Sequence, residues 1–300
     1  MASIKELRQR IKSVGNIKQI TRAMEMVATT KLRRFQDRAV ASRPYAREIA
    51  SLVRSLAAML GEQVEGRPLF REGAGEATAV LIVGSDRGLC GAYNSNLLRS
   101  TERWLAARRA GGDADADRPV HFYVIGKKVY QYLSKRGRHV ERYLVEPPLE
   151  KLDFRGASLV ARILADAFLS GAYRDVQVHF TAFESMVRYV PTHVQLLPIS
   201  AQALGAGDEQ ADSQIADVIL EPDAATIFDQ LVPRYIETTL FNALLESLTS
   251  EYASRRFSMK NATDAATDMQ GILKSVYNRK RQETITKELL DIVGGVEALR

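Results

Sequence analysis

The stretch IKELRQRIKSVGNIKQITRAMEMV, residues 4–27, decides the first element of the fold. Its large apolar residues recur at steps of three or four, at Ile4, Leu7, Ile11, Val14, Ile17, Ile20, Met24 and Val27. This spacing gathers them on one side of an α-helix and is typical of a seam between packed helices. A three-residue step from Val14 to Ile17 replaces a step of four, which predicts local overwinding of a coiled coil.

The helical pattern continues to about residue 60, interrupted only by Pro44, which is predicted to kink or break the helix. Residues 1–54 hold 13 basic and 4 acidic side chains, a net charge of +9, against +6 for the whole chain of 300 residues. So basic a helix favours an acidic protein surface, nucleic acid or an anionic membrane as its partner.

The C-terminal segment, residues 220–300, has the same helical character. Large apolar residues recur there at steps mostly of three or four, at Ile227, Leu231, Ile236, Leu240, Leu244, Leu248 and Tyr252, then Met269, Leu273 and Val276, and then Ile285, Leu289, Ile292, Val296 and Leu299. Small residues at Ala262, Ala265 and Ala266 predict a close approach of two helices. We expect the terminal helices to be antiparallel neighbours, with the tip of the longer C-terminal helix protruding alone.

The middle of the chain alternates short apolar runs with helical stretches. Val80–Val83, Val120–Ile125, Val176–Phe183 and Val190–Leu197 are typical of strands. This alternation predicts the fold class α/β: a central Rossmann-like domain with a largely parallel sheet, carrying a long antiparallel two-helix coiled coil formed by the N- and C-terminal helices. The expected domains are 1–60 (N-terminal shaft helix), 76–215 (central base domain) and 220–300 (C-terminal shaft helix).

The glycine-rich stretch GSDRGLCG, residues 84–91, is the strongest candidate for chemistry, because it follows a strand and precedes a helix. Its glycine spacing departs from the dinucleotide pattern, and no G-x4-G-K-[ST] occurs in the chain. A tight strand-to-helix turn therefore explains it better than nucleotide binding. The four histidines, at 121, 139, 179 and 193, have no metal-ligand spacing, and Cys90 has no histidine nearby in sequence.

These observations predict no catalytic residue, no cofactor and no metal site, and a chain that is not an enzyme by itself. One cysteine excludes an internal disulfide. No apolar run is long enough for a membrane helix, and the N-terminus lacks the features of a secretory signal. The residues alone favour a structural interaction shaft, followed by a nucleic-acid-binding coiled coil and then a degenerate nucleotide enzyme.

Three segments resemble the γ subunit of F-type ATP synthases. The first is ITRAMEMVA, residues 20–28, with SRPY at 42–45 behind it. The second is Asp86-Arg87-Gly88-Leu89-Cys90-Gly91, followed by Asn94 and Asn96. The third is YNRKRQ at 277–282, with ITKEL at 285–289 and IVGG at 292–295. The resemblance covers essentially the whole length of the chain.

The resemblance implies a central-stalk rotor. A ring of three α and three β subunits would surround the shaft, and the base would sit with the ε subunit on a membrane-embedded c-ring. Rotation of the shaft would couple proton flow to ATP synthesis or hydrolysis on that ring. The chain would be a peripheral membrane protein on the cytoplasmic face of a bacterial inner membrane, without inserting into the bilayer or binding nucleic acid.

The resemblance also assigns residues to the interface with the α/β ring. Met24 would face the β-subunit loops. Arg281 and Gln282 would form polar contacts with the catalytic subunits, and Thr286 and Glu288 lie about one helical turn further along. The apolar tip, turning in a hydrophobic sleeve, would be Ile292, Val293, Val296 and Leu299. Packing of that tip on the N-terminal helix is the alternative. The base motif Asp86, Arg87, Gly88, Cys90 and Gly91 would be structural.

Two departures from the family pattern bear on this reading. Val296 stands where the family usually has alanine, a conservative change for an apolar bearing. The dithiol-bearing insertion of plant chloroplast γ subunits is absent, so the resemblance implies no thiol regulation by that route. No family motif matches residues 200–217.

Overall fold

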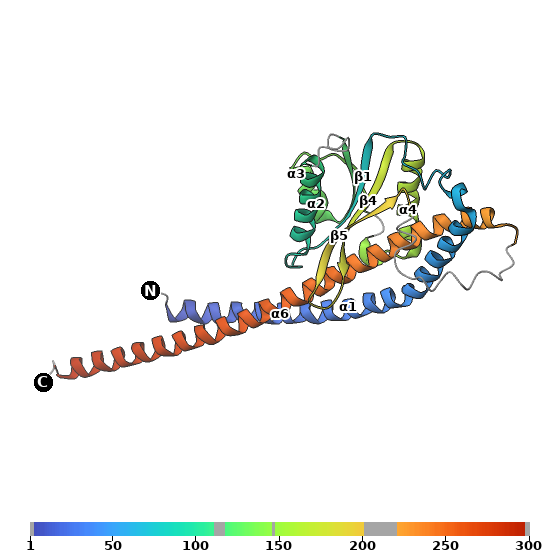
Figure 1. Cartoon of the computed structure of the whole chain (residues 1–300). Helices are drawn as coiled ribbons and strands as arrows, with labels where there is room; N and C mark the ends of the chain where they lie inside the picture. The colour runs from blue at the N-terminus through green and yellow to red at the C-terminus, as the bar shows by residue number, and fades with distance from the viewer. Residues whose placement is uncertain (1–2, 111–117, 146–147, 201–220, 298–300) are drawn as a thin grey trace. The chain divides into compact units, whose positions relative to one another are not determined.

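The computed structural model describes residues 3–110, 118–145, 148–200 and 221–297. The chain forms two compact units, which are described separately. The helix-pair unit comprises Met1–Thr30 and Arg255–Arg300, and the sheet unit comprises Lys31–Ser254. Two long helices, α1 (Ile4–Leu60) and α6 (Ala224–Glu297), each contribute residues to both units (Figure 1).

The sheet unit is built on five strands in the order β3-β2-β1-β4-β5. Their bounds are β1 Ala77–Val83, β2 Val120–Ile125, β3 Val140–Tyr143, β4 Tyr173–Phe183 and β5 Tyr189–Leu197. Strands β1 to β4 pair in parallel, and β5 is antiparallel to β4. All seven residues of β1 are buried, as expected of a central parallel strand covered on both faces. The expectation of a largely parallel sheet is confirmed, although the short edge strand β3 was not predicted.

Helices cover both faces of this sheet (Figure 1). They are α2 (Tyr93–Ala110), α3 (Lys127–Lys135) and α4 (Phe154–Leu169), with short 3-10 helices at Gly61–Val64 and Leu149–Lys151. Helices α2 and α3 pack on β1 and β2 through a core that includes Val80, Ile82, Leu97, Phe122 and Leu133. Helix α4 starts at Asp153, whose Oδ1 accepts a hydrogen bond from the Gly156 amide at 2.9 Å.

In the helix-pair unit, α1 and α6 are antiparallel. The Arg8 guanidinium donates a hydrogen bond to the Tyr277 hydroxyl at 3.5 Å, and the Thr263 hydroxyl donates to that of Thr21 at 2.8 Å. Residue numbers therefore rise along α1 as they fall along α6, as expected from the sequence. Between these contacts, a Cβ added at Gly15 would lie 3.1 Å from Nε2 of Gln270, so the end of the Gln270 side chain lies against the Gly15 backbone.

The predicted seam of α1 is right at its start and wrong further along. Leu7 is buried and Val14 is half-buried, but Ile17, Ile20 and Val27 are more than half exposed. The predicted positions Ile4, Ile11 and Met24 are half-buried as well. Leu7, Ile11, Val14, Lys18, Thr21, Glu25 and Ala28 are all at least half-buried and step by four and three without interruption, so a regular seam continues past the predicted three-residue slip. From Lys18 onward mainly small and polar residues lie against α6, whereas Ile17, Ile20 and Val27 point to solvent.

Helix α1 runs unbroken through Pro44, and α6 runs unbroken through Pro233. The alternative that Pro44 breaks its helix is therefore wrong. Among the helices that the structure describes, none combines the length and the hydropathy needed to cross a membrane.

Candidate interface on the long helices

The C-terminal part of α6 continues well past the hydrogen bond that joins it to the start of α1. Arg8, near the start of α1, meets Tyr277, whereas α6 continues to Glu297 (Figure 1). From Arg281 to Val293 every side chain except the half-buried Thr284 is exposed. The predicted protrusion of this end beyond the N-terminal helix is therefore observed within the helix-pair unit.

The polar residues at the base of this protruding end fall into two groups. Arg279 and Lys280 form ion pairs with Glu283, at 3.2 and 3.1 Å. Hydrogen bonds from Lys280 and Arg279 lower the pKa of the Glu283 carboxyl. Arg281 and Gln282 are exposed, and neither forms a side-chain hydrogen bond or ion pair with any described residue. Their donors are therefore available to another protein.

Further along α6, apolar side chains are exposed on several sides of the helix. Ile292 is 64% exposed and Val293 is 62% exposed, and Leu289 and Leu290 are comparably open. Neither Ile292 nor Val293 packs on the N-terminal helix, which was the alternative for this tip. Thr286 and Glu288 are exposed beside them. The side chain of Val296 and the whole of Leu299 lie outside the described residues.

Met24 lies half-buried on α1, and its neighbours Met26 and Val27 are exposed. Ile17 and Ile20 are exposed on the same helix, one to two turns earlier. Burial of contiguous apolar surface against a partner is the common reason for such exposure in a folded protein. In sequence these residues follow the same steps of three and four as the seam, so the pattern alone could not show that Ile17, Ile20 and Val27 are exposed.

The glycine-rich turn, residues 84–91, lies at the carboxyl end of β1, where a phosphate would bind in a nucleotide-binding fold. Side chains hold its ends in place. The Ser85 amide donates to Asn94 Oδ1 at 3.1 Å, and Asp86 Oδ1 accepts a hydrogen bond from the Lys127 amide, at the start of α3, at 3.0 Å. Cys90 is buried, and its carbonyl accepts a hydrogen bond from Ser254 at 2.6 Å. The turn is thus held by contacts with α2, α3 and α6.

Close packing explains two glycines near this turn. A Cβ on Gly84 would lie 2.2 Å from Cγ2 of Val129, and a Cβ on Gly126 would lie 2.4 Å from the Gly84 carbonyl oxygen. Gly91 and Leu89 have φ values of 55° and 60°, in the left-handed region. By contrast, Gly88 has space for a side chain, with its nearest neighbour 3.8 Å away.

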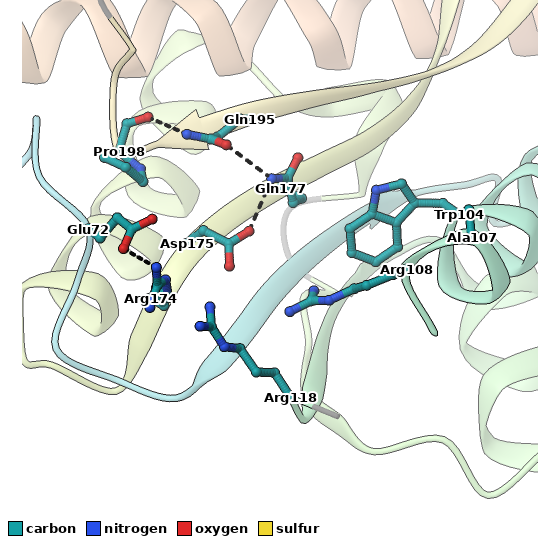
Figure 2. Close-up of a pocket in the computed structure, with 10 residues that line it drawn as sticks. All are labelled: Glu72, Trp104, Ala107, Arg108, Arg118, Arg174, Asp175, Gln177, Gln195 and Pro198. Carbon is teal, nitrogen blue, oxygen red and sulfur yellow. Dashed lines mark hydrogen bonds and ion pairs between the residues drawn. The ribbon is translucent and has the colours of Figure 1, made fainter. Parts of the chain in front are cut away.

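A cavity of about 350 Å³ opens at the amino end of β4, away from the glycine-rich turn, and Figure 2 shows its lining. Arg174 forms an ion pair with Glu72, and Gln177 donates to Asp175 at 3.0 Å. Arg108 lies over the Trp104 ring, 5.4 Å from its centroid. Among the described residues that line it, none is a serine, cysteine or histidine, so they include no nucleophile with an adjacent base.

With this geometry in place, comparison with known proteins gives a consistent result. The sequence matches the family model described as ATP synthase over residues 3–299. It is 37% identical over 300 residues to the ATP synthase gamma chain of Geotalea uraniireducens, covering 100% of both chains. This chain belongs to the ATP synthase gamma chain family. It is also 39% identical to the gamma chain of Mycolicibacterium vanbaalenii, covering 99% of this chain and 98% of that one.

Solved structures share the gamma-chain fold. A rotor in the mitochondrial ATP synthase of Euglena gracilis aligns with a TM-score of 0.61 and 19% identity, covering 94% of this chain and 98% of that chain. A central-stalk chain from the Tetrahymena thermophila mitochondrial ATP synthase aligns with a TM-score of 0.56 and 23% identity, covering 81% of this chain and 99% of that chain. These matches confirm the fold class predicted from the sequence.

The four histidines of this gamma-family chain, scattered in sequence, form two pairs. His179 and His193 have ring centroids 4.1 Å apart beneath Trp104, and His179 Nδ1 is 3.1 Å from the Thr101 hydroxyl. His121 and His139 have centroids 4.5 Å apart at the sheet edge, beside Glu141. The sequence analysis missed both pairs, because each forms only when strands align side by side.

Proposed function

We propose that this chain is the central-stalk rotor subunit of a bacterial ATP synthase. In this role it couples proton flow through a membrane c-ring to ATP synthesis or hydrolysis on a surrounding α3β3 ring. The chain carries no catalytic residue of its own, and its part in the enzyme complex is mechanical. Family membership supports the parent complex, and the exposed end of α6 supports the mechanical role.

The observation that carries the proposal is that end of α6. Residues 281–293 follow Tyr277, which hydrogen-bonds to Arg8 of α1, and they expose both unpaired polar groups and apolar side chains. Leaving so many apolar side chains in water is costly, and a stable partner around the helix removes that cost. A shaft can drive a neighbour between states only if it binds those states with different free energies, so the exposed side chains are the groups that would make this difference.

Charge supports the same assignment. The helix-pair unit holds 15 basic and 8 acidic residues, a net charge of +7, more than the whole chain's +6. A basic shaft favours acidic loops on the subunits that face it. We assign the interface to Met24, Arg281, Gln282, Thr286, Glu288, Ile292, Val293, Val296 and Leu299.

The first experiment is co-expression with the α and β subunits of the same source, followed by gel filtration and an ATPase assay. We expect one copy of this chain to elute with an α3β3 ring whose ATPase activity depends on it. A chain that elutes alone would contradict the proposal and favour the basic coiled coil as a nucleic-acid binder, tested through the salt dependence of binding.

Arg281→Ala combined with Gln282→Ala tests the predicted contact of these two side chains with the catalytic subunits. Because both side chains are exposed and unpaired among the described residues, the double variant should fold normally but lower ATP-driven proton pumping in the reconstituted complex. Arg279→Ala is the matched control, since it removes one nearby positive charge that is already paired with Glu283. Unchanged pumping in the double variant would refute the assignment.

The non-catalytic part of the proposal is tested on the isolated chain. In the glycine-rich turn the Ser85 amide already donates to Asn94, and the Asp86 carboxylate adds negative charge while accepting from the Lys127 amide, so the turn is poorly suited to hold a phosphate. We expect no binding at micromolar ATP by calorimetry. A dissociation constant for ATP in the micromolar range would contradict this and favour the alternative of a degenerate nucleotide enzyme.

The remaining partners concern the sheet unit. We propose that it sits with the ε subunit on the c-ring, so that the chain is a peripheral protein on the cytoplasmic face of the bacterial inner membrane. Crosslinking of the sheet unit to ε or c subunits in intact membranes tests this placement. Crosslinks only to proteins outside the complex would contradict it.

A further inference from the structure

Three potential ligand side chains converge at one edge of the sheet. His121 lies on β2, His139 immediately precedes β3, and Glu141 lies on β3. Strand β2 pairs in parallel with β3, with Phe122 opposite Val140 and the Phe122 amide donating to the His139 carbonyl at 3.0 Å. Alternate residues of a strand point to the same face, so this register puts all three side chains on one face.

The distances suit a small metal ion. His139 Nε2 lies 3.0 Å from Glu141 Oε2, and His121 Nδ1 lies 3.8 Å from the same oxygen. All three ligand atoms lie within 4.8 Å of one another. Ligand atoms about 2.0–2.1 Å from a tetrahedral Zn²⁺ are separated by roughly 3.3 Å, so only small rotations would bring these atoms into position.

The surroundings hold one ligand and leave the others accessible. The His121 ring stands edge-on to Tyr173, with centroids 5.7 Å apart, which limits its rotation. The side chains of Glu141 and His139 are 43% and 59% exposed, so an ion can reach them from solvent.

We propose that His121, His139 and Glu141 form a zinc site that joins the edge strand β3 to β2. Two imidazoles and one carboxylate supply three protein ligands and leave the fourth position to water. Imidazole ligands select zinc, copper or nickel over magnesium and calcium, which prefer sites made of oxygen ligands alone. The bound ion would stabilise the edge of the sheet, which otherwise depends on the four-residue strand β3.

Calorimetry with ZnCl₂ on the full chain, purified without a polyhistidine tag and freed of metal by a chelator, tests the site. We expect one zinc per chain with a dissociation constant below about 10 µM, and a thermal midpoint raised by roughly 5 °C at saturating zinc. His139→Ala and Glu141→Gln should each weaken binding by at least about tenfold. Glu62→Gln, which removes an exposed carboxylate elsewhere in the sheet unit, should leave binding unchanged.

Visible absorption of the Co²⁺-loaded chain provides an independent readout, because a four-coordinate site of nitrogen and oxygen ligands lacks the thiolate charge-transfer band. The proposal is overturned if the double variant His139→Ala/Glu141→Gln binds zinc as tightly as the natural chain. It is also overturned if a thiolate band appears, since that would assign the ion to Cys90, the single cysteine. Neither outcome bears on the rotor function.

Discussion

Gly126 shows how tightly single residues are constrained in the sheet unit. Its φ of 103° is rarely adopted by residues with a side chain, and an added Cβ would lie 2.4 Å from the Gly84 carbonyl oxygen. Gly126→Ala should therefore destabilise the chain by about 2 kcal/mol or more, measured by urea denaturation. Gly88→Ala is the matched control and should change stability little, because no heavy atom lies within 3.8 Å of its added Cβ. Equal effects of the two changes would contradict this account.

His179 should make stability depend on pH. Burial, reinforced by His193, lowers its pKa well below 6.5, and its Nε2 has no hydrogen-bond partner among the described residues. At acidic pH the His179 side chain therefore binds a proton in the unfolded chain but stays neutral in the folded chain. Stability should be fully present above about pH 6.5 and fall below it by roughly 1.4 kcal/mol per pH unit, until the pH reaches the folded-state pKa.

His179→Asn should flatten this dependence in urea titrations between pH 5 and 7, a range set by the ordinary histidine pKa of about 6.5. His139→Asn, measured with a chelator present, is the control, because that side chain is exposed and the steep dependence should remain. A slope unaffected by His179→Asn would show that other groups cause the acid sensitivity.

At the scale of elements, the pairing of α1 with α6 depends on small side chains in the seam. Ala266 is buried between Thr263 and Gln270, which both lie against α1, whereas the adjacent Ala265 is exposed. Ala266→Trp should force the helices apart and cost about 1–3 kcal/mol, seen as faster amide exchange in residues 255–275. Ala265→Trp should leave the exchange rates unchanged. Similar protection in both variants would mean that the seam is not packed at Ala266.

At the scale of the whole molecule, the exposed apolar surface of the helix-pair unit should make the isolated chain self-associate. Leu289→Ser, Ile292→Ser and Val293→Ser together should reduce self-association in analytical ultracentrifugation, because all three residues are more than half exposed. The thermal midpoint should change by less than about 2 °C, since surface changes away from packed groups cost little. Leu273→Ser, at a half-buried seam position, should instead lower it. Undiminished association of the triple variant would place the self-associating surface elsewhere.

The order and type of the main elements, and the family of the chain, could be predicted from the amino-acid sequence. Helical periodicity and consecutive apolar runs such as Ala77–Val83 act locally, and a local preference can be read from neighbouring residues. The same pattern marked Ile292 and Val293 as apolar positions, but it could not show that they face solvent.

Which apolar residues are buried, and which polar residues come into contact, could be read only from the folded chain. Ile17 and Ile20 fit a helical seam in sequence, but the small residues on α6 selected Val14, Lys18 and Thr21 to lie against it. His121, His139 and Glu141 come together only because β2 and β3 pair in one register. Burial and convergence depend on the partner segment, which is distant in sequence, so local patterns cannot determine them.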